Sequence, residues 1–360
     1  MKKILISTGG SGGHVIPAMC LYDHLKDKFD VKIVTDKRGS KFLNIENYPS
    51  NIIKVPNLFK RIYLIPINLI FFIISIFNSF IYLKKNNIEY MFSTGGYMSL
   101  PFCFASILLK IKIFLFEPNM VLGRSNKFIL NNCKKIICYD NFIKNFPQNY
   151  TNKKYLISPL LRKEIYNCNK NFKQEIGESI KILVMGGSQG ASFFDNIIKD
   201  IIIKLSKDYK IDLTQQVYDE KIKSTLKKSY DKAFIKNELI NFDQNLFKRF
   251  SEFDIAFTRS GASAISELSF FNIPFIAIPF PSAKDNHQYY NAKYYEDKNC
   301  CWILKQKDIE LDIHKFTIFI KKILDEKNDY FEKKENLNKI SYQNTWNNIN
   351  QRLISLVNEN

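Results

Sequence analysis

The sequence predicts an α/β protein built from two doubly wound domains, and three observations lead to this prediction. The chain has 360 residues, which exceeds the usual size of one compact domain. Short apolar runs alternate with helical patterns through both halves, as expected for parallel sheets that are covered by helices on both faces. In each half, one apolar run leads directly into a glycine-rich loop, TGGSGGH (Thr8–His14) and GGSQGAS (Gly186–Ser192).

The first half begins with a strand, a glycine loop, a helix and a second strand. An amphipathic pattern over Pro17–Lys28 predicts the helix. The apolar runs that predict the strands of this half are Lys3–Ser7, Val31–Thr35, Ile88–Ser93, Ile113–Phe116 and Lys135–Tyr139. The third of these runs continues into TGGY (Thr94–Tyr97), which repeats the strand-to-glycine pattern of the first loop.

The second half repeats this organisation. Its strands are predicted at Ile180–Met185, Asp254–Thr258 and Pro274–Pro279. The polar segment Ser158–Lys181 lies between the last strand of one half and the first strand of the next, which is typical of a hinge. We therefore expect an N-terminal domain over residues 1–160 and a second domain over residues 161–340.

Composition limits the partners and the compartment. The chain has 53 Lys and Arg against 35 Asp and Glu, a formal charge of +18, which favours anionic partners unless it only reflects a general richness in Lys, Asn and Ile. No nucleic-acid-binding module is recognised, so we expect no nucleic acid partner. Seven scattered cysteines without a C-x-x-C pair indicate a reducing cytosol and no structural metal. Glycines interrupt the apolar run after Ile6, so the N-terminus is interpreted as a strand rather than a secretory signal.

One apolar segment departs from the pattern. Ile62–Leu83 carries no charge and is bracketed on each side by two basic residues. It is long enough to span a bilayer, but a span here would divide one sheet across a membrane. We favour a helix that lies in the membrane interface with its basic ends on anionic headgroups, while a core helix and a true span stay open. In this interpretation Phe72, Ile73 and Ile76 contact lipid.

The two glycine loops suit phosphate groups. Ligands of open parallel sheets lie beyond the carboxyl ends of the strands, where glycine lets a phosphate approach N–H groups at a helix start. A tight turn without a ligand is the alternative for either loop alone. The dinucleotide fingerprint G-x-G-x-x-G fails in both loops, in the first because Val15 takes the third glycine position, and no P-loop motif occurs. Asp36 still resembles a ribose-binding acid, which keeps an NAD-dependent oxidoreductase as an alternative.

A further constellation follows in the second half. TRSGASAISE (Thr258–Glu267) turns from a strand into a helix, with one carboxylate two turns into the helix. Glu267 could accept hydrogen bonds from both hydroxyls of a ribose, although a solvated surface position is the alternative. Ser188, Ala262 and Ser263, near helix starts, could donate to a diphosphate.

Six short motifs are distributed along nearly the whole globular chain. They are GGSGGH (Gly9–His14), TGGYMSLP (Thr94–Pro101), EPNMVLGRSN (Glu117–Asn126), GGSQGAS (Gly186–Ser192), RSGASAISE (Arg259–Glu267) and PFPSAKDNHQYYNA (Pro279–Ala292). On these motifs the chain resembles the MurG family of peptidoglycan N-acetylglucosaminyltransferases, in glycosyltransferase family 28. The resemblance implies a GT-B fold, in which two Rossmann-like domains face a deep cleft. It also implies that residues 341–360 form a helix that packs back on the N-terminal domain.

The resemblance implies a division of the substrates between the domains. The N-terminal domain would bind the lipid-linked acceptor, with Gly95, Gly96 and Tyr97 facing it, and the C-terminal domain would bind UDP-N-acetylglucosamine. Carried over by motif, the donor site comprises Ser11, Gly12, Gly13, Asn119, Arg162, Ser188, Asp243, Ala262, Ser263, Ala264, Ile265, Ser266, Glu267 and Gln288. The chain departs from the family pattern at Pro118, in the segment before Arg162, and at Asp243, where an apolar residue is usual.

The implied reaction moves N-acetylglucosamine, with inversion, from UDP to the 4-hydroxyl of the muramoyl sugar of lipid I, forming lipid II. His14 is our candidate for the base that takes the hydroxyl proton, and Glu117 is a second candidate for orienting or replacing it. The acceptor places the enzyme at the cytoplasmic face of the inner membrane, as a peripheral protein on anionic phospholipid, with other cell-wall synthesis proteins as further partners. Another GT-B glycosyltransferase acting on a membrane lipid is the nearest alternative.

We expect catalysis without a metal or other cofactor. The chain lacks the Asp-x-Asp pair that holds a divalent metal in many sugar-nucleotide transferases, so N–H groups, helix dipoles, Ser188 and Arg162 would stabilise the leaving diphosphate. Glycosyl transfer by the purified enzyme should therefore continue in excess EDTA, at a rate unchanged when Mg²⁺ is restored. Loss of transfer in EDTA and its recovery with Mg²⁺ would contradict this expectation.

Overall fold

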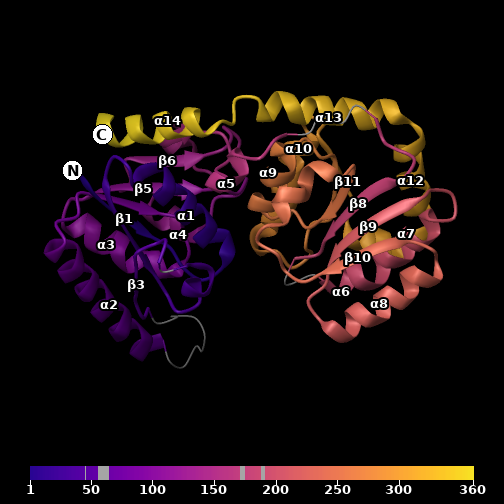
Figure 1. The fold of residues 1–360 in the computed structure, drawn as a ribbon. Helices are drawn as coiled ribbons and strands as arrows, with labels where there is room; N and C mark the ends of the chain where they lie inside the picture. The colour runs from indigo at the N-terminus through magenta and orange to yellow at the C-terminus, as the bar shows by residue number, and fades with distance from the viewer. Residues whose placement is uncertain (45, 56–64, 171–174, 188–190) are drawn as a thin grey trace. The chain divides into compact units, whose positions relative to one another are not determined.

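The structure is a computed structural model that describes residues 1–44, 46–55, 65–170, 175–187 and 191–360 (Figure 1). It forms two compact units. Unit 1 comprises Met1–Tyr166 and Thr345–Asn360, and unit 2 comprises Asn167–Asn344. Each unit contains one parallel sheet with helices packed on it, as the alternation of apolar runs and helical patterns predicts.

The unit boundaries differ by a few residues from those expected at 160 and 340. The first falls after Tyr166, whose ring packs edge-on against the ring of Trp346 with 5.7 Å between centroids, and this contact keeps the segment in unit 1. The second falls after Asn344, because Ser341 still belongs to unit 2, where its Oγ donates a hydrogen bond of 3.0 Å to Asn272 Oδ1.

The sheet of unit 1 has seven parallel strands in the order β3-β2-β1-β4-β5-β6-β7. They are β1 (Lys3–Ser7), β2 (Asp30–Thr35), β3 (Ser50–Ile52), β4 (Tyr90–Ser93), β5 (Lys112–Glu117), β6 (Lys135–Cys138) and β7 (Lys154–Leu156). The strand order changes direction between β1 and β4. In doubly wound sheets, ligands bind beyond the carboxyl ends of the strands at this switch point.

The helices of unit 1 cover both faces of this sheet. They are α1 (Gly12–Leu25), α2 (Ile65–Lys85), α3 (Leu100–Leu108), α4 (Arg124–Ile129), α5 (Lys163–Tyr166) and α14 (Trp346–Glu359), with 3-10 turns η1 (Gly39–Phe42), η3 (Tyr97–Ser99) and η4 (Gln148–Lys153). Alternate residues of β1 point to opposite faces. Ile4 and Ile6 pack with α1 and α14, while Leu5 packs with α2 and α3.

The apolar helix α2 packs against α3 and buries one face (Figure 1). Its inward side chains recur at helical spacing and include Phe72, Ser75, Ser79 and Leu83. Its solvent-facing side is also apolar and comprises Ile67, Leu69, Ile70, Phe71, Ile73, Ile74, Phe77 and Ile81. By length and composition alone, Ile67–Lys85 could cross a membrane, and only 22% of this segment is buried. The predicted segment began at residue 62, and residues 62–64 lie outside the described residues.

Two of the three predicted lipid contacts on α2 need correction. Phe72 is 7% exposed and its ring packs against those of Tyr97 and Phe104, so this side chain belongs to the core. Ile76 is half-buried against the same core, and Ile73 lies on the exposed face as expected. Hydrophobicity alone could not orient a helix that is apolar on both faces, since only the packing of α3 decides which face is inward.

The C-terminal helix α14 packs on α1 in unit 1 (Figure 1). The contact centres on His24, which is buried and stacks on the ring of Trp346 with 3.7 Å between centroids. Ile349, Leu353 and Val357 continue the contact along one side of α14. Burial lowers the pKa of His24 to about 3, so this imidazole is neutral in the folded protein at neutral pH.

The sheet of unit 2 has six parallel strands in the order β10-β9-β8-β11-β12-β13. They are β8 (Ile180–Met185), β9 (Ile211–Gln216), β10 (Lys236–Ile240), β11 (Ile255–Thr258), β12 (Phe275–Ala277) and β13 (Cys301–Ile303). Here the order changes direction between β8 and β11, so the second glycine loop follows a switch-point strand, as the first loop does in unit 1.

The helices of unit 2 also lie on both faces of its sheet. They are α6 (Ala191–Phe193), α7 (Lys199–Leu205), α8 (Glu220–Lys232), α9 (Ala262–Phe270), α10 (His287–Glu296), α11 (Gln306–Leu311), α12 (Ile313–Asp325) and α13 (Lys327–Ser341). A π-helical turn, η5 (Phe194–Ile198), joins α6 to α7, and 3-10 turns occur at η6 (Leu246–Glu252) and η7 (Lys284–Asn286). One core combines α7, α8 and α12, while α9 packs with α10 and α13.

We predict that His24 makes unit 1 less stable in mild acid. As the pH falls through 6.5 the unfolded chain takes up a proton on this imidazole and the folded chain does not, so the free energy of unfolding should fall by about 1.6 kcal/mol between pH 6.5 and pH 5. His24→Phe keeps an aromatic ring against Trp346 and should remove this part of the pH dependence. Denaturant unfolding followed by Trp346 fluorescence, in a Trp302→Phe background, measures it. Equal pH dependence with and without His24 would contradict the prediction.

Candidate active site

The switch point of unit 1 is lined by two glycine turns. Gly10, after β1, has φ +88°, and Gly95 and Gly96, after β4, have φ +87° and +81°. Residues other than glycine rarely adopt these φ values, so the backbone conformation explains why glycine occurs in both turns. Both turns lie where ligands of doubly wound sheets bind.

His14 lies between these two turns, in the first turn of α1. Its Nδ1 is 2.8 Å from the main-chain oxygen of Thr94. A carbonyl oxygen can only accept, so Nδ1 carries the proton and Nε2 keeps the lone pair that can take up another. A Cβ on Gly95 would lie 3.3 Å from His14 Cε1, and one on Gly96 would lie 3.4 Å from His14 Cδ2. The two glycines therefore let the turn close around the imidazole.

The start of α1 presents main-chain N–H groups to the same edge. Ser11 is the N-cap residue, with extended backbone, and its carbonyl accepts from the N–H groups of His14 and Val15. Within the described residues, no side chain caps this helix start, where the predicted site residues Gly12 and Gly13 are exposed or half-buried. Uncapped N–H groups and the helix dipole favour an anion here.

Asp36, the acid that resembled a ribose ligand, holds the first glycine loop instead. Its Oδ1 accepts from the N–H groups of Gly10 at 2.9 Å and Gly39 at 2.8 Å, and its Oδ2 accepts from Arg38 Nε at 2.9 Å. Burial opposes ionisation, but these bonds leave the pKa of Asp36 below its ordinary value. Both oxygens of Asp36 therefore accept hydrogen bonds from the protein, and its role is structural. Asp36 was the residue that kept an NAD-dependent oxidoreductase as an alternative.

Glu117 ends β5 and holds the loop that follows it. Its Oε1 accepts from the N–H and side-chain amide of Asn119 at 3.3 and 3.2 Å, and its Oε2 accepts from Gly123 N at 2.7 Å and Asn126 Nδ2 at 3.0 Å. Burial raises the pKa of Glu117 although these bonds favour the ionised form. With four donors on its carboxylate, we interpret Glu117 as an anchor for the loop rather than a proton acceptor in the reaction.

Asn126 was absent from the sequence-based site. This buried side chain also donates from Nδ2 to the Phe116 carbonyl at 3.0 Å, and a Cβ on Gly95 would lie 3.8 Å from the same nitrogen. It therefore connects the Glu117 loop to the turn that encloses His14. The only signal for it in the sequence was its position at the end of the EPNMVLGRSN motif.

Tyr97 and Arg162 are the remaining predicted residues of unit 1. The ring of Tyr97 packs 5.6 Å from that of Phe72, which ties the loop after β4 to α2. Arg162 is half-buried directly before α5, and its carbonyl accepts from Ile165 N at 3.0 Å.

Several of the predicted donor residues lie at the switch point of unit 2. Gly187, in the loop after β8, has φ +66°, and a Cβ there would lie 3.9 Å from Arg259 Cγ. Ser188 lies outside the described residues. Gly261 is the N-cap residue of α9, and within the described residues no side chain caps this helix. Ala262, Ser263 and Ala264 form its first turn and are half-buried, so their N–H groups can meet a diphosphate.

The other predicted donor residues have different accessibilities. Ile265 and Ser266 turn their side chains into the core, so only their main chain could reach a ligand, whereas Glu267 on the next position is half-buried. Gln288 Oε1 accepts from Phe280 N at 2.9 Å, and this bond turns the two amide N–H donors of Gln288 away from Phe280.

Asp243 is exposed, as a surface loop residue. Its Oδ1 accepts from Asn245 N at 2.7 Å, so the carboxylate stabilises its own turn.

Arg259 and Asn291 support the loops of the unit 2 site through hydrogen bonds. Neither residue was part of the site predicted from the sequence. Arg259 Nη1 donates to the carbonyls of Ile278 at 3.1 Å and Pro279 at 3.3 Å, and burial lowers its pKa to about 10. The buried Asn291 donates from Nδ2 to the carbonyl of Ser260 at 3.2 Å. Both side chains fix loops at the carboxyl edge of the sheet.

Neither edge shows a metal centre in the described part of the chain. Among those residues, no group of three or more His, Cys, Asp or Glu side chains is close enough to hold a metal ion.

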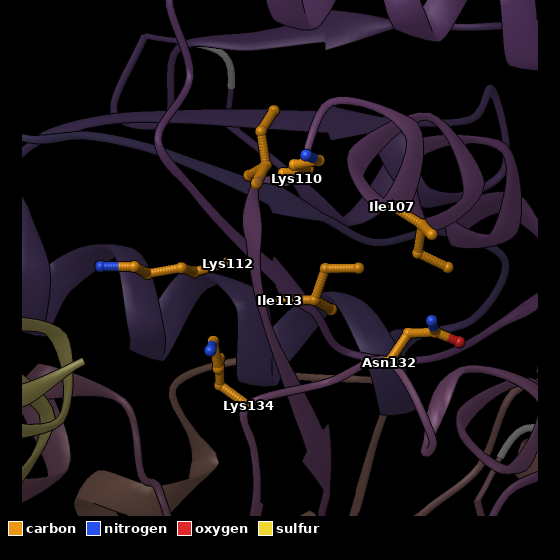
Figure 2. Close-up of a pocket in the computed structure, with 7 residues that line it drawn as sticks. Ile107, Lys110, Lys112, Ile113, Asn132 and Lys134 are labelled. Carbon is orange, nitrogen blue, oxygen red and sulfur yellow. The ribbon is translucent and has the colours of Figure 1, made fainter.

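A separate pocket of about 180 Å³ lies at the amino end of β5, the edge opposite to the glycine turns (Figure 2). Lys110, Lys112 and Lys134 line it, and Lys112 points away from the other labelled side chains. Lys110 follows the end of α3 by two residues, where a cation complements the helix dipole. Lys112 Nζ lies 5.2 Å from the ring centroid of Tyr90. These roles explain Lys110 and Lys112 without a ligand.

Comparisons with known proteins identify the family. The model of the Glycosyltransferase family 28 N-terminal domain matches residues 4–138, and that of the C-terminal domain matches residues 181–349. A Pelagibacter ubique protein named UDP-N-acetylglucosamine–N-acetylmuramyl-(pentapeptide) pyrophosphoryl-undecaprenol N-acetylglucosamine transferase is 47% identical over 100% of this chain and 99% of its own. The chain belongs to the MurG family. A Rickettsia bellii protein of the same name is 36% identical over 86% of this chain and 87% of its own.

Solved structures show the fold of the MurG family chain. The crystal structure of Acinetobacter baumannii MurG matches with a TM-score of 0.78 at 21% identity, over all of both chains. A UDP-GlcNAc 2-epimerase from Neisseria meningitidis, solved with UDP-GlcNAc, matches with a TM-score of 0.66 at 11% identity, over 99% of this chain and 100% of its own. The two parallel-sheet units are therefore of the GT-B type that the motifs predicted.

We predict that an alanine at Gly95 disturbs His14. The substitution places a side chain at positive φ and within 3.3 Å of the imidazole, and should lower the free energy of unfolding of unit 1 by about 1–3 kcal/mol. Nitrogen NMR of the His14 ring should report a changed hydrogen bond to Thr94.

Gly177→Ala is the matched control, since the added Cβ would lie 4.0 Å from its nearest neighbour atom, Ser179 O. It should change stability by less than about 0.5 kcal/mol. A Gly95→Ala protein as stable as the Gly177→Ala protein, with an unchanged ring signal, would show that the turn does not depend on glycine.

Proposed function

We propose that this chain transfers N-acetylglucosamine from UDP-N-acetylglucosamine to the 4-hydroxyl of the muramoyl sugar in undecaprenyl-pyrophosphoryl-MurNAc-pentapeptide, lipid I, to form lipid II of peptidoglycan synthesis. The observation that carries the proposal is 47% identity, over the full length of both chains, to a protein named for this transfer. His14 at one switch point and the uncapped start of α9 at the other supply chemistry that such a transfer needs.

The proposed reaction is a single displacement. The 4-hydroxyl oxygen attacks the anomeric carbon of N-acetylglucosamine, the bond from that carbon to the UDP oxygen breaks, and the linkage inverts. His14 Nε2 accepts the hydroxyl proton as the new bond forms, because the Thr94 carbonyl keeps the ring proton on Nδ1. This hydrogen bond also orients the ring and stabilises the positive charge that the imidazole gains.

The leaving UDP gains negative charge on its diphosphate. In the proposed site, the first N–H groups of α9 and its helix dipole meet this charge, with Ser188 and Arg162 as further donors and without a metal ion. Glu267 accepts from the ribose hydroxyls, and Gln288 donates its amide N–H groups to the sugar. The Phe280–Gln288 hydrogen bond supports this orientation of the amide.

Acceptor identity is tested by release of UDP from UDP-N-acetylglucosamine in the presence of lipid I or of diacylglycerol. Lipid I alone should stimulate release and yield lipid II. Stimulation by diacylglycerol instead would favour a glycosyltransferase of another membrane lipid.

The membrane contact is also a proposal. A polyprenyl diphosphate stays in the bilayer while UDP-N-acetylglucosamine is cytosolic, so we propose a peripheral protein on the cytoplasmic face of the inner membrane. The exposed apolar side of α2 supports this, since contiguous apolar surface of this kind marks an interaction site. Lys84 and Lys85 at its end suit anionic headgroups.

We predict that His14→Ala lowers kcat by about 10²–10⁴-fold, the usual contribution of a general base, with UDP affinity within twofold of wild type. Steady-state kinetics with lipid I and calorimetry with UDP measure the two effects. His314→Ala, at an exposed histidine of unit 2, is the control and should leave both unchanged. A kcat within threefold of wild type in His14→Ala would remove His14 from the mechanism.

We predict that Ile70→Glu with Phe77→Glu releases the chain from phosphatidylglycerol vesicles. Each side chain is more than half exposed on α2, and removing its apolar contact should weaken partitioning at least about tenfold. Vesicle sedimentation measures this, and UDP affinity should be retained. Ile318→Glu, at an isoleucine of unit 2 that is also more than half exposed, is the control. Unchanged sedimentation of the double variant would show that α2 does not bind the chain to the membrane.

A further inference from the structure

A buried polar chain runs through the core of unit 2 and includes one residue of the helix that follows the second glycine loop. Tyr230 OH, on α8, donates to Gln215 Oε1 at 2.7 Å, and Gln215 Nε2 donates to Asp195 Oδ1 at 2.9 Å. Gln215 and Tyr230 are 0% exposed and Asp195 is 5% exposed. The surrounding core is apolar, with Phe194 and Ile198 beside Asp195 in sequence. The proposed transfer mechanism gives these three polar groups no role.

Gln215 contacts one residue before the second glycine loop and one residue after it. Its backbone, near the end of β9, pairs with Val184 of β8, two residues before the loop begins at Gly186. Its side chain holds Asp195, in the helix that begins after the loop at Ala191. One residue therefore ties the strand that enters the loop to the helix that leaves it.

The helix after the loop begins with irregular geometry at this point. Asp195 lies in the π-helical turn η5 (Phe194–Ile198), which departs from the regular i→i+4 hydrogen-bond pattern. Such turns shift the helix start relative to the rest of the helix, and they occur frequently at functional sites. Asn196 Nδ2 donates to the Ser192 carbonyl at 2.9 Å and links this turn to the first residues of the helix.

Burying the carboxylate of Asp195 in this apolar core costs free energy. Burial raises the pKa of Asp195 to about 6, with the hydrogen bond from Gln215 opposing the shift. An apolar residue would fill the same core without this cost, so the charge and its hydrogen bond have a purpose other than packing.

We infer that Asp195, Gln215 and Tyr230 form a positioning network that holds β8 before the second glycine loop against the helix after it, and so keeps this edge of the sheet in place for the diphosphate of the sugar nucleotide. The inference rests on the proposed function, because it assumes that UDP binds at the unit 2 switch point. Asp195 acts through the loop and does not touch the substrate. The network sets the affinity for the donor and leaves the acceptor and the proton transfer unaffected.

Binding of UDP to the full-length chain, measured by calorimetry, tests the network. Asp195→Ala should raise the Kd for UDP and the KM for UDP-N-acetylglucosamine about tenfold, which matches the loss of one hydrogen bond to a charged group. The KM for lipid I should stay within twofold. Asp195→Asn keeps an oxygen that accepts from Gln215 and should restore most of the lost affinity.

Tyr230→Phe and Tyr330→Phe form a matched pair. Both tyrosines are buried in unit 2 and each donates one hydrogen bond, from Tyr230 at 2.7 Å and from Tyr330 to the Asp254 carbonyl at 2.8 Å. Both variants should lower Tm by a similar few degrees, but only Tyr230→Phe should weaken UDP binding.

Equal effects of the two tyrosine variants on the Kd for UDP would overturn the inference, as would an unchanged Kd in folded Asp195→Ala. Asp195→Asn as weak as Asp195→Ala would also overturn it. Failure of the wild-type chain to bind UDP would instead contradict the proposed function itself.

Discussion

The hydrogen bond between His14 Nδ1 and the Thr94 carbonyl is the interaction on which the unit 1 site depends. It joins the start of α1 to the turn after β4 across the point where the strand order changes direction. It sets which imidazole nitrogen can accept a proton, and it requires the turn to lie against the ring. Gly95 and Gly96 follow from that requirement, since any Cβ there would lie against the imidazole and would need a rarely adopted φ.

Buried carboxylates hold the loops at the carboxyl edges of both sheets. Asp36 accepts from two N–H groups of the first glycine loop and η1, and Glu117 accepts from two N–H groups of the loop after β5. In unit 2, the buried Asp195 accepts from Gln215, whose backbone pairs with β8 before the second glycine loop. Loops at ligand sites have few apolar contacts, so hydrogen bonds to a buried acceptor supply the order that packing cannot.

Much of the fold and part of the site could be predicted from the sequence. Apolar runs that end in glycine turns indicated strands β1, β4 and β8, because parallel strands buried on both faces are continuously apolar. The glycine turns could be identified because a backbone with positive φ requires glycine, and His14 because it directly follows the first of these turns. Asn126, Arg259 and Asp195 were missed as site residues, because their contacts are with residues distant in sequence and a lone polar residue gives no sign of its partner.

The sequence by itself determined two parallel-sheet domains and the turns that need glycine, since these depend on local backbone preferences and on the period of apolar residues. Only the tertiary structure decided which face of α2 is buried, because that helix is apolar on every side and the packing of α3 selects the inward one. Tertiary structure also decided that Asp36 and Glu117 hold loops. A carboxylate's role depends on which N–H groups surround it in space, and the order of residues along the chain does not specify them.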